Sequence, residues 1–343
     1  MERGAHGERC WMLMERGAHG EGCSWRGVTV LWEEQSFRCG FWCSNVIGGG
    51  IETEKNRYSN IVLFDEGAVI LETTKHDKPD ETYIHATKIK CKFGNYVLAQ
   101  SPKPETLNDW YRMIWQLKIA VIVCLIPLPA KDDCAKYFER QIGKKLKHKR
   151  FVIRTVTSRK EGSCNVYELK FSNKDAKEED RVIHLINFTK WKVIVRPPET
   201  RQILEMMRSV WATEASAKLA DDKVTPTLVH GITGTRRTGT YVILSMLCRQ
   251  IKYHRQMSLL SACSRVRHLR YSVMRNRICF TVLIESALTF AADQGLVNSA
   301  SDSFKDAIKV KRACHEFKAH VKSSKRVHKF KLKAHAISSR FTS

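Results

Sequence analysis

The sequence predicts an α/β fold in a single domain, with an additional segment at each end. The chain has 343 residues, and 43% of them are hydrophobic, which is sufficient for one large domain with its own core. From Ile51 onward, short apolar stretches typical of strands alternate with stretches that follow the helical period. We therefore expect a domain over residues 51–295, between an N-terminal extension over 1–50 and a C-terminal tail over 296–343.

Four stretches follow the helical period, and each is expected to bury one face of a helix. The apolar positions of these faces are Leu107, Trp110, Tyr111, Ile114 and Leu117; Ile203, Met206, Met207, Val210 and Trp211; Ile243, Met246, Leu247 and Ile251; and Cys279, Val282, Leu283, Ser286, Ala287 and Phe290. Thr106 precedes the first helix and is expected to cap it, and the third helix is expected to start near Arg237. Strands are predicted at 120–125, 151–156, 166–171 and 181–186.

The first 50 residues show neither strand nor helix periodicity. Residues 1–8 (MERGAHGE) recur identically at 14–21, which indicates a short tandem duplication, and two copies cannot form a solenoid. The segment is rich in glycine, and Gly48-Gly49-Gly50 separates it from the rest of the chain. We expect residues 1–50 to form a largely disordered extension.

Positive charge dominates the chain, which has 59 lysines and arginines, 35 acidic residues and a formal net charge of +24. Such a charge favours anionic partners such as phosphopeptides, nucleic acid or acidic lipid. Beyond Ser303 the only acidic residues are Asp306 and Glu316, so the C-terminal segment is a basic tail. One hypothesis is that the tail binds nucleic acid or an acidic membrane, and the other is that it is a solvated, disordered extension.

The sequence favours a cytoplasmic or nuclear protein without a transmembrane segment. The longest apolar run, from Ile119 to Ala130, is about half of the ~20 residues that a bilayer requires, and the chain does not begin with a secretion signal. In a reducing compartment the 12 cysteines are expected to be mainly buried thiols. Cys39 and Cys43 are the only close pair and have no further ligands nearby, so neither a metal site nor a cofactor is predicted.

A candidate phosphate site follows the short apolar stretch Thr227-Leu228-Val229. The next residues, 230–240 (HGITGTRRTGT), predict a glycine-containing turn that leads into a helix. A strand, a tight turn and a helix N-terminus together direct backbone N–H groups and the positive end of a helix dipole at one point, which suits phosphate. The guanidinium of Arg237 could bind two phosphate oxygens. A nucleotide-binding P-loop is the rival interpretation, but Arg236 and Arg237 stand where that motif needs Gly and Lys.

This stretch resembles the protein-tyrosine phosphatase signature, in which His-Cys is followed by five residues, then Arg and Ser or Thr. The matching residues are His230, Gly234, Arg237, Thr238, Gly239 and Thr240. The similarity extends from about residue 56 to about residue 288. The other segments that carry it follow the family's order and are Lys55-Asn56-Arg57-Tyr58, Tyr83-Ile84-His85-Ala86, residues 96–102 (YVLAQSP), the aromatic-rich segment 110–115, Cys134-Ala135-Lys136-Tyr137-Phe138 and Phe188-Thr189-Lys190-Trp191. The resemblance implies a mixed twisted sheet flanked by helices.

The resemblance also implies that three catalytic groups of the family are missing. The family's nucleophilic cysteine corresponds to Gly231, which has no nucleophile, and no cysteine adjoins the loop. The general acid corresponds to Val193, and its loss alone would typically reduce the rate by ~10²–10⁴. The glutamines that position water should lie near residues 273–275, where Met274 stands in place of the first. The chain therefore resembles an inactive member, a pseudophosphatase.

Phosphate binding does not require the thiolate, whose charge would repel a phosphate dianion. The resemblance assigns the phosphate-binding loop to Gly231, Ile232, Thr233, Gly234, Thr235, Arg236, Arg237 and Thr238. Ile232, Thr233 and Thr235 are β-branched, which could distort the loop. Tyr58 corresponds to the side chain that packs against a phosphotyrosine ring, whereas Asn60 replaces the family's substrate-binding aspartate. His230 is expected to be a hydrogen-bonded core histidine.

We expect a phosphatase-like module without catalysis, which binds a phosphotyrosine protein or peptide or acts as a scaffold. One alternative is an active protein-tyrosine phosphatase that uses other groups. A second is binding of nucleic acid or acidic membrane through the tail. A third is a decaying gene copy whose product has no role, which the duplicated start and the lost motifs would also fit.

Overall fold

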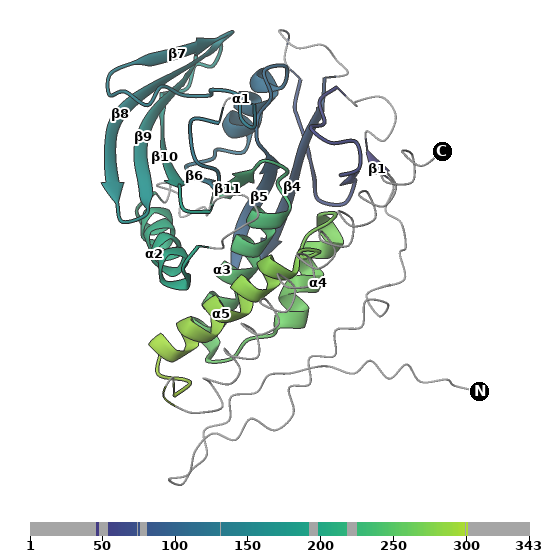
Figure 1. Cartoon of the computed structure of the whole chain (residues 1–343). Helices are drawn as coiled ribbons and strands as arrows, with labels where there is room; N and C mark the ends of the chain where they lie inside the picture. The colour runs from purple at the N-terminus through teal and green to yellow at the C-terminus, as the bar shows by residue number, and fades with distance from the viewer. Residues whose placement is uncertain are drawn as a thin grey trace, which may run out of the picture.

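A nine-stranded mixed sheet forms the centre of the fold (Figure 1). The computed structural model describes residues 46–47, 54–73, 75, 81–130, 132–191, 198–217, 225–298 and 300. The strands are β1 Val46–Ile47, β2 Leu63–Phe64, β3 Ala68–Ile70, β4 Tyr83–Cys91, β5 Gly94–Gln100, β6 Val121–Cys124, β7 Lys145–His148, β8 Phe151–Glu161, β9 Cys164–Asn173, β10 Arg181–Phe188 and β11 Thr227–Gly231. The helices are α1 Leu107–Gln116, α2 Thr200–Ser216, α3 Arg236–His254, α4 Leu259–Leu269 and α5 Arg277–Asp293.

The order of strands in this sheet is β3-β4-β5-β11-β6-β10-β9-β8-β7. The four central strands β5, β11, β6 and β10 run parallel, and antiparallel strands extend the sheet on both sides. The carboxyl ends of the parallel strands meet at one edge, where Gly231 lies opposite Gln100 and His230 lies opposite Cys124. In sheets of this kind, loops at that edge form the ligand site.

A hydrophobic layer packs on each face of the sheet. Helix α1 covers one face, where Trp110, Tyr111 and Ile114 pack against strand residues such as Ile122 and Phe171. Helices α2, α3, α4 and α5 cover the other face (Figure 1). The predicted mixed sheet flanked by helices is therefore confirmed.

The four predicted helices correspond to α1, α2, α3 and α5. The predicted strands are also present, although β8 and β9 are longer than expected. Thr106 precedes α1 but does not cap it with its side chain, because its Oγ1 accepts a hydrogen bond from the amide of Lys103 at 3.0 Å. Helix α4 and the edge strand β7 were not predicted.

The termini are described only in part. Strand β1 pairs with β2, so ordered structure includes two residues of the segment 1–50. The other residues of that segment, among them the duplication, Cys39 and Cys43, lie outside the described residues, as does the chain from 301 onward. The extension, the tail and the domain boundaries therefore stay predictions. Within the described ranges no helix is both long enough and apolar enough to cross a membrane.

Candidate phosphate-binding site

The loop after β11 lies at the carboxyl edge of the parallel strands. Strand β11 ends at Gly231 and α3 begins at Arg236, so only four residues turn the chain from the sheet into the helix. The amide of Ser101, just after β5, donates to the carbonyl of Ile232 at 3.3 Å, and the amide of Leu125, just after β6, donates to the carbonyl of His230 at 3.0 Å. Both neighbouring strands thereby hold the start of the loop.

Gly234 gives this turn its shape. Its φ is +66°, in the left-handed region that residues with a side chain rarely adopt. A Cβ at this position would lie 2.4 Å from the carbonyl carbon of Ala99, because the loop presses directly on β5. The turn is therefore compact even though Ile232, Thr233 and Thr235 beside it are β-branched.

The amides of the loop are available to a ligand. Thr235 precedes α3, and its side chain makes no capping hydrogen bond. Instead its hydroxyl pairs with that of Thr233 at 2.8 Å. The backbone N–H groups of residues 233 to 237 donate to no other atom of the described part of the chain. Together with the helix dipole they can bind an anion.

Arg237 connects the loop to two other segments. Its Nη1 donates to the carbonyl of Leu125 at 2.7 Å and to the carbonyl of Trp191 at 3.3 Å. The side chain is half-buried, and burial is the main reason that its pKa is lowered from the ordinary value. Within the described ranges neither Nη2 nor Nε has a hydrogen-bond partner. Arg237 thus has the bridging role of a structural arginine and still has donors for a ligand.

Gly231 is buried at the base of the loop, and it does not need to be glycine. Its φ is not positive, and a Cβ would have an ordinary contact of 3.6 Å with Cγ2 of Thr238. The Thr238 hydroxyl is buried and has no hydrogen-bond partner among the described residues. A buried hydroxyl is normally hydrogen-bonded, so the unpaired hydroxyl of Thr238 is an unusual feature. It is a free donor at the base of the loop, beside the position where a larger side chain would fit.

Two thiols lie close to the loop in space, which corrects the expectation that no cysteine adjoins it. Cys124 is the strand partner of His230, and Cys279 of α5 lies near Thr240 and Arg237. Burial raises the pKa of Cys124 to about 12 and also raises the pKa of Cys279. Both are therefore protonated thiols at neutral pH, and a thiol is a poor nucleophile.

His230 is completely buried beneath the loop, as predicted for a core histidine. Its Nε2 lies 2.9 Å from the hydroxyl of Tyr137, and its ring lies against the edge of Trp110 at 5.2 Å between centroids. Burial lowers the pKa of His230 to about 3, so the ring is neutral.

A buried arginine supports the loop from the other side. Arg270 is 1% exposed and donates to the carbonyls of Gly234 at 3.1 Å and Thr233 at 3.3 Å. It also donates to Nδ1 of His85 at 2.9 Å, while Nε2 of His85 donates to the carbonyl of Ile61 at 2.9 Å. This support was not predicted, although His85 lies in one of the segments that carried the resemblance.

The segment 55–58 is held beside the loop. The amide of Arg57 donates to Oε1 of Gln100 at 3.1 Å, and Nε2 of Gln100 donates to the carbonyl of Lys55 at 2.7 Å. Because Gln100 is the strand partner of Gly231, the segment lies next to the base of the loop. Tyr58 is 46% exposed there, and Asn60 is also exposed. An exposed ring at this place can pack against a ligand.

The remaining predicted positions are described only in part. Trp191 is buried and packs edge-on against Phe188, whereas Lys192 and Val193 lie outside the described residues. Met274 is buried with a φ of +60°, and its sulfur lies 3.8 Å from the hydroxyl of Thr240. Within the described ranges no group of three or more possible metal ligands is present.

A sequence profile described as "Protein-tyrosine phosphatase" matches residues 52–289, which is more than half of the chain. The chain belongs to the protein-tyrosine phosphatase family. The receptor-type tyrosine-protein phosphatase alpha of Homo sapiens is 27% identical over 240 residues, which are 68% of this chain and 29% of the human protein. Tyrosine-protein phosphatase 99A of Drosophila melanogaster is 26% identical over 267 residues, or 74% of this chain and 19% of the fly protein.

A viral relative has a more similar length. Tyrosine phosphatase H3 of Microplitis demolitor bracovirus is 25% identical over 240 residues, which are 64% of this chain and 74% of the viral protein. By contrast, the chain spans less than a third of the human and fly proteins. The resemblance to the protein-tyrosine phosphatase family is thus confirmed.

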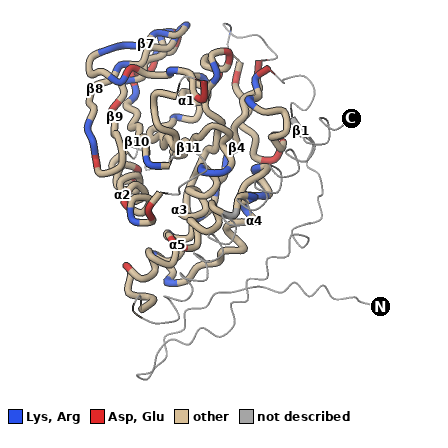
Figure 2. The backbone as a smooth tube through the Cα atoms, in the orientation of Figure 1, with Lys and Arg blue, Asp and Glu red and all other residues tan. Residues whose placement is uncertain are grey.

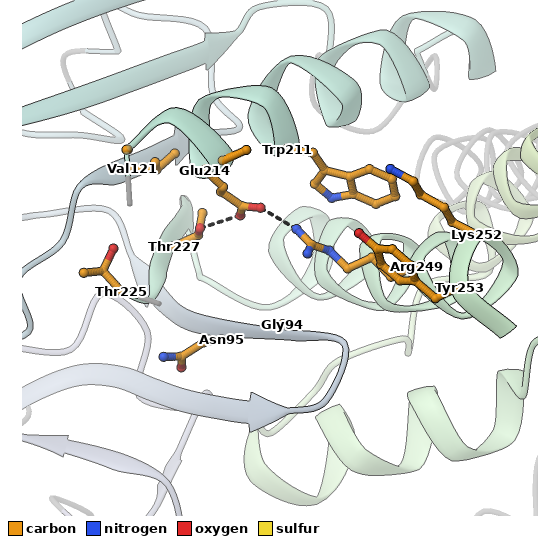
Figure 3. A pocket seen from close by; sticks show the side chains of 12 residues that line it. Gly94, Asn95, Val121, Trp211, Glu214, Thr225, Thr227, Arg249, Lys252 and Tyr253 are labelled. Carbon is orange, nitrogen blue, oxygen red and sulfur yellow. Dashed lines mark hydrogen bonds and ion pairs between the residues drawn. The ribbon is translucent and has the colours of Figure 1, made fainter. Parts of the chain in front are cut away.

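A hollow lies at the amino ends of the parallel strands, which is the opposite end from the loop after β11 (Figure 3). Its volume is about 370 Å³, and it lies between the ends of α2 and α3 and the starts of β5, β6 and β11. Glu214 points into it and accepts hydrogen bonds from Thr227 and Arg249. The guanidinium of Arg249 also lies 4.9 Å from the ring of Trp211. The charges of this hollow are therefore largely satisfied by one another.

Acid is expected to destabilise this phosphatase domain through its buried histidines. Burial lowers the pKa values of His85 and His230 from 6.5 to about 3, so the unfolded chain binds protons that the folded protein does not. The contribution of the two neutral histidines to the free energy of unfolding is fully present above pH 6.5 and is lost as the pH falls toward 3. The free energy of unfolding should fall by up to about 2.7 kcal/mol per pH unit for the two groups together.

Urea unfolding at several pH values measures this effect. His230→Gln should be less stable at neutral pH but should show a shallower pH dependence than the wild type. His254→Gln is the matched control because it makes the same substitution at an exposed position. Equal slopes of the free energy of unfolding against pH for the wild type and for His230→Gln would contradict the assignment of this pH dependence to His230.

Proposed function

We propose that this member of the protein-tyrosine phosphatase family binds phosphotyrosine without hydrolysing it, and acts as a binding or scaffolding module. The observation that carries this proposal is that the base of the loop has no nucleophile. Gly231 stands where the family signature has its cysteine, and the buried hydroxyl of Thr238 beside it has no partner among the described residues. A site without a nucleophile cannot form a phosphoenzyme.

No neighbouring group is a good substitute for the missing cysteine. The thiols of Cys124 and Cys279 are buried and have raised pKa values. The hydroxyls of Thr233 and Thr235 hydrogen-bond to each other, and no base that could activate them is bonded to either among the described residues. Val193, at the position of the general acid, has no proton to give in any conformation. These features support binding without turnover.

The binding function rests on the groups that remain. The amides of residues 233 to 237, the N-terminus of α3 and the free donors of Arg237 can bind three phosphate oxygens without a metal or a cofactor. Without a thiolate, a phosphate dianion is not repelled by a charged sulfur at the base of the loop. Tyr58 would pack against the ring of the ligand, and Asn60 would face the peptide backbone. A phosphotyrosine protein is therefore the proposed partner.

Replacing Arg237 with alanine is expected to weaken the binding of a phosphotyrosine peptide more than 100-fold. Two charge-assisted hydrogen bonds are lost, each of about 1.5–3 kcal/mol. Calorimetric titration measures the two affinities, with unphosphorylated peptide as the reference. Arg236→Ala is the matched control, because Arg236 is the neighbouring residue, carries the same charge and is exposed.

Arg237 also bridges Leu125 and Trp191, so its variant must first be shown by thermal unfolding to remain folded. Arg237→Lys keeps the charge and should retain part of the affinity. Equal affinities of the wild type and Arg237→Ala would reject the phosphate site. Release of phosphate by the purified wild type would instead favour the alternative of an active phosphatase.

A further inference from the structure

A second cationic surface lies far from the phosphate loop in the strand order, at the β7 end of the large sheet. Side chains alternate between the two faces of each strand. On the face that is opposite to α1, strand pairing brings together Lys145 and Lys147 of β7, Arg154 of β8 and Lys170 of β9. We call these four residues the basic face. Figure 2 shows lysines and arginines gathered along β7 and the adjacent part of β8.

Like charges lie directly opposite each other across the strands of the basic face. Lys145 is the partner of Arg154, and Arg154 is in turn the partner of Lys170, so these three residues form one row across the strands. Only Lys170 of this row has an ion pair among the described residues, with Asp180 at 3.0 Å. Like charges in direct cross-strand pairs destabilise a sheet. The row therefore lowers stability unless an anion lies over it.

Protection of a sheet edge accounts for only part of this pattern. Lysines on an edge strand prevent pairing with other chains, and β7 is the last strand of the sheet order. Arg154, however, lies in β8, which has a partner strand on each side. Its charge cannot protect an edge, so edge protection does not account for the row itself.

No described helix covers the basic face. Helix α2 lies on the same side of the sheet, but it packs against β6 and β10. It reaches β8 at the last residue of that strand, where the hydroxyl of Ser209 donates to the carboxylate of Glu161 at 2.9 Å. The aliphatic side chain of Val182, the strand partner of Lys170, is 49% exposed on this face. The surface is thus open to a large partner.

An exposed isoleucine lies in the turn that leads into β7. Ile142 is 63% exposed, more than any other large hydrophobic residue of the described part of the chain. The turn is fixed by a hydrogen bond from the amide of Gly143 to the carbonyl of Thr155 at 2.8 Å. Arg140, Lys144 and Lys145 flank the isoleucine in sequence, so cations stand on both sides of this apolar residue along the chain.

We propose that the basic face and Ile142 together dock on an anionic lipid surface. Cations near such a surface are attracted by its negative potential, and an apolar side chain among them can enter the boundary between headgroups and acyl chains. Nucleic acid fits less well, because the alternate positions of β7 to β10 on this face (Lys145, Lys147, Val152, Arg154, Glu168, Lys170, Ser172, Val182 and His184) include no phenylalanine, tyrosine or tryptophan on which a base could stack. This surface is separate from the proposed phosphotyrosine site.

The test is sedimentation of the full-length protein with lipid vesicles. The wild type should bind vesicles of phosphatidylcholine with about one fifth phosphatidylserine and should not bind phosphatidylcholine alone. Lys145→Glu with Lys147→Glu should lower the partition coefficient at least roughly 25-fold. The same variant should unfold at a higher urea concentration, because a glutamate opposite Arg154 replaces repulsion with attraction.

Matched variants distinguish docking through the basic face from an effect of net charge alone. Lys88→Glu with Lys90→Glu makes the same charge change at two exposed positions of β4, at the other end of the sheet, and should bind vesicles as the wild type does. All variants retain the basic tail, so a difference between them reports the basic face. Ile142→Ser should reduce vesicle binding and leave binding of single-stranded RNA unchanged.

Three outcomes would overturn the proposal. Equal losses for the β4 pair and the β7 pair would mean that only net charge matters. Unchanged vesicle binding by Ile142→Ser would exclude insertion of this side chain. Tighter binding of RNA than of vesicles, abolished by the β7 variant, would assign the basic face to nucleic acid.

Discussion

Replacing Gly234 with alanine is expected to destabilise the protein by about 3 kcal/mol or more. The φ of +66° alone costs a residue with a side chain about 1–2 kcal/mol. The new Cβ would also lie 2.4 Å from the carbonyl carbon of Ala99, and relieving such an overlap typically costs a further ~1–3 kcal/mol. Because Ala99 lies in β5, the relief would move the loop off the sheet.

Gly231→Ala is the matched control for that variant. Gly231 ends β11 directly before the turn that contains Gly234, but a Cβ at Gly231 meets only Cγ2 of Thr238, at 3.6 Å. Its free energy of unfolding should stay within about 1 kcal/mol of the wild type. Urea unfolding monitored by tryptophan fluorescence gives both values. Equal losses of stability in the two variants would contradict the geometry described for the loop.

Replacing Gly231 with cysteine is expected to create a reactive thiol where the wild type has none. The new side chain fits beside Thr238, whose buried hydroxyl has no partner among the described residues and could donate to the sulfur. The N-terminus of α3 and Arg237 both favour a thiolate, so the pKa of the new thiol should lie well below its ordinary range. Iodoacetate should therefore alkylate the variant much faster than the wild type.

The same variant should become phosphorylated by a phosphotyrosine peptide and should turn over slowly. Attack on phosphorus needs the thiolate, but departure of the tyrosine is aided by a general acid, and valine at position 193 cannot supply a proton. The absence of this aid should keep the rate about 10²–10⁴ below that of an intact phosphatase site. Mass spectrometry of the quenched protein measures the phosphoenzyme.

Thr238→Ala in the background of Gly231→Cys tests the part played by the hydroxyl. It should raise the pKa of the new thiol and slow its alkylation, because one donor to the sulfur is lost. If the Gly231→Cys thiol reacts no faster than a free cysteine, the loop does not stabilise an anion. The binding proposal would then lose its physical basis.

The sequence was sufficient to predict the architecture and the location of the loop. Apolar periodicity located α1, α2, α3 and α5, since each buries a stripe of residues such as Ile243 and Leu247. The resemblance supplied the mixed sheet, which periodicity alone does not determine. Gly234 and Arg237 were recognised because the signature needs both residue types at that spacing.

The two missed elements differ in the local signal that they carry. Helix α4 buries Ala262, Cys263, Val266 and Leu269, which follow the helical period, and Ser258, whose side chain caps it, was a further usable signal. Strand β7 consists of lysine, leucine, lysine and histidine, and nothing in four such residues distinguishes an edge strand from a loop. The strand exists because it pairs with β8, which is a tertiary effect.

The support of the loop could not be predicted from sequence either. Arg270 is 36 residues from Gly234 and 185 residues from His85, and only the fold brings the three together. The thiols of Cys124 and Cys279 likewise approach the loop from β6 and α5. Such convergence of distant segments leaves no pattern in a single sequence.

Binding without turnover is tested most directly by a calorimetric titration of the wild-type protein with a phosphotyrosine peptide, after which the peptide is recovered and its mass is measured. We predict saturable binding at one site and a recovered peptide that still carries its phosphate. A peptide recovered without phosphate, or a protein that binds the phosphorylated and unphosphorylated peptides equally, would contradict this prediction.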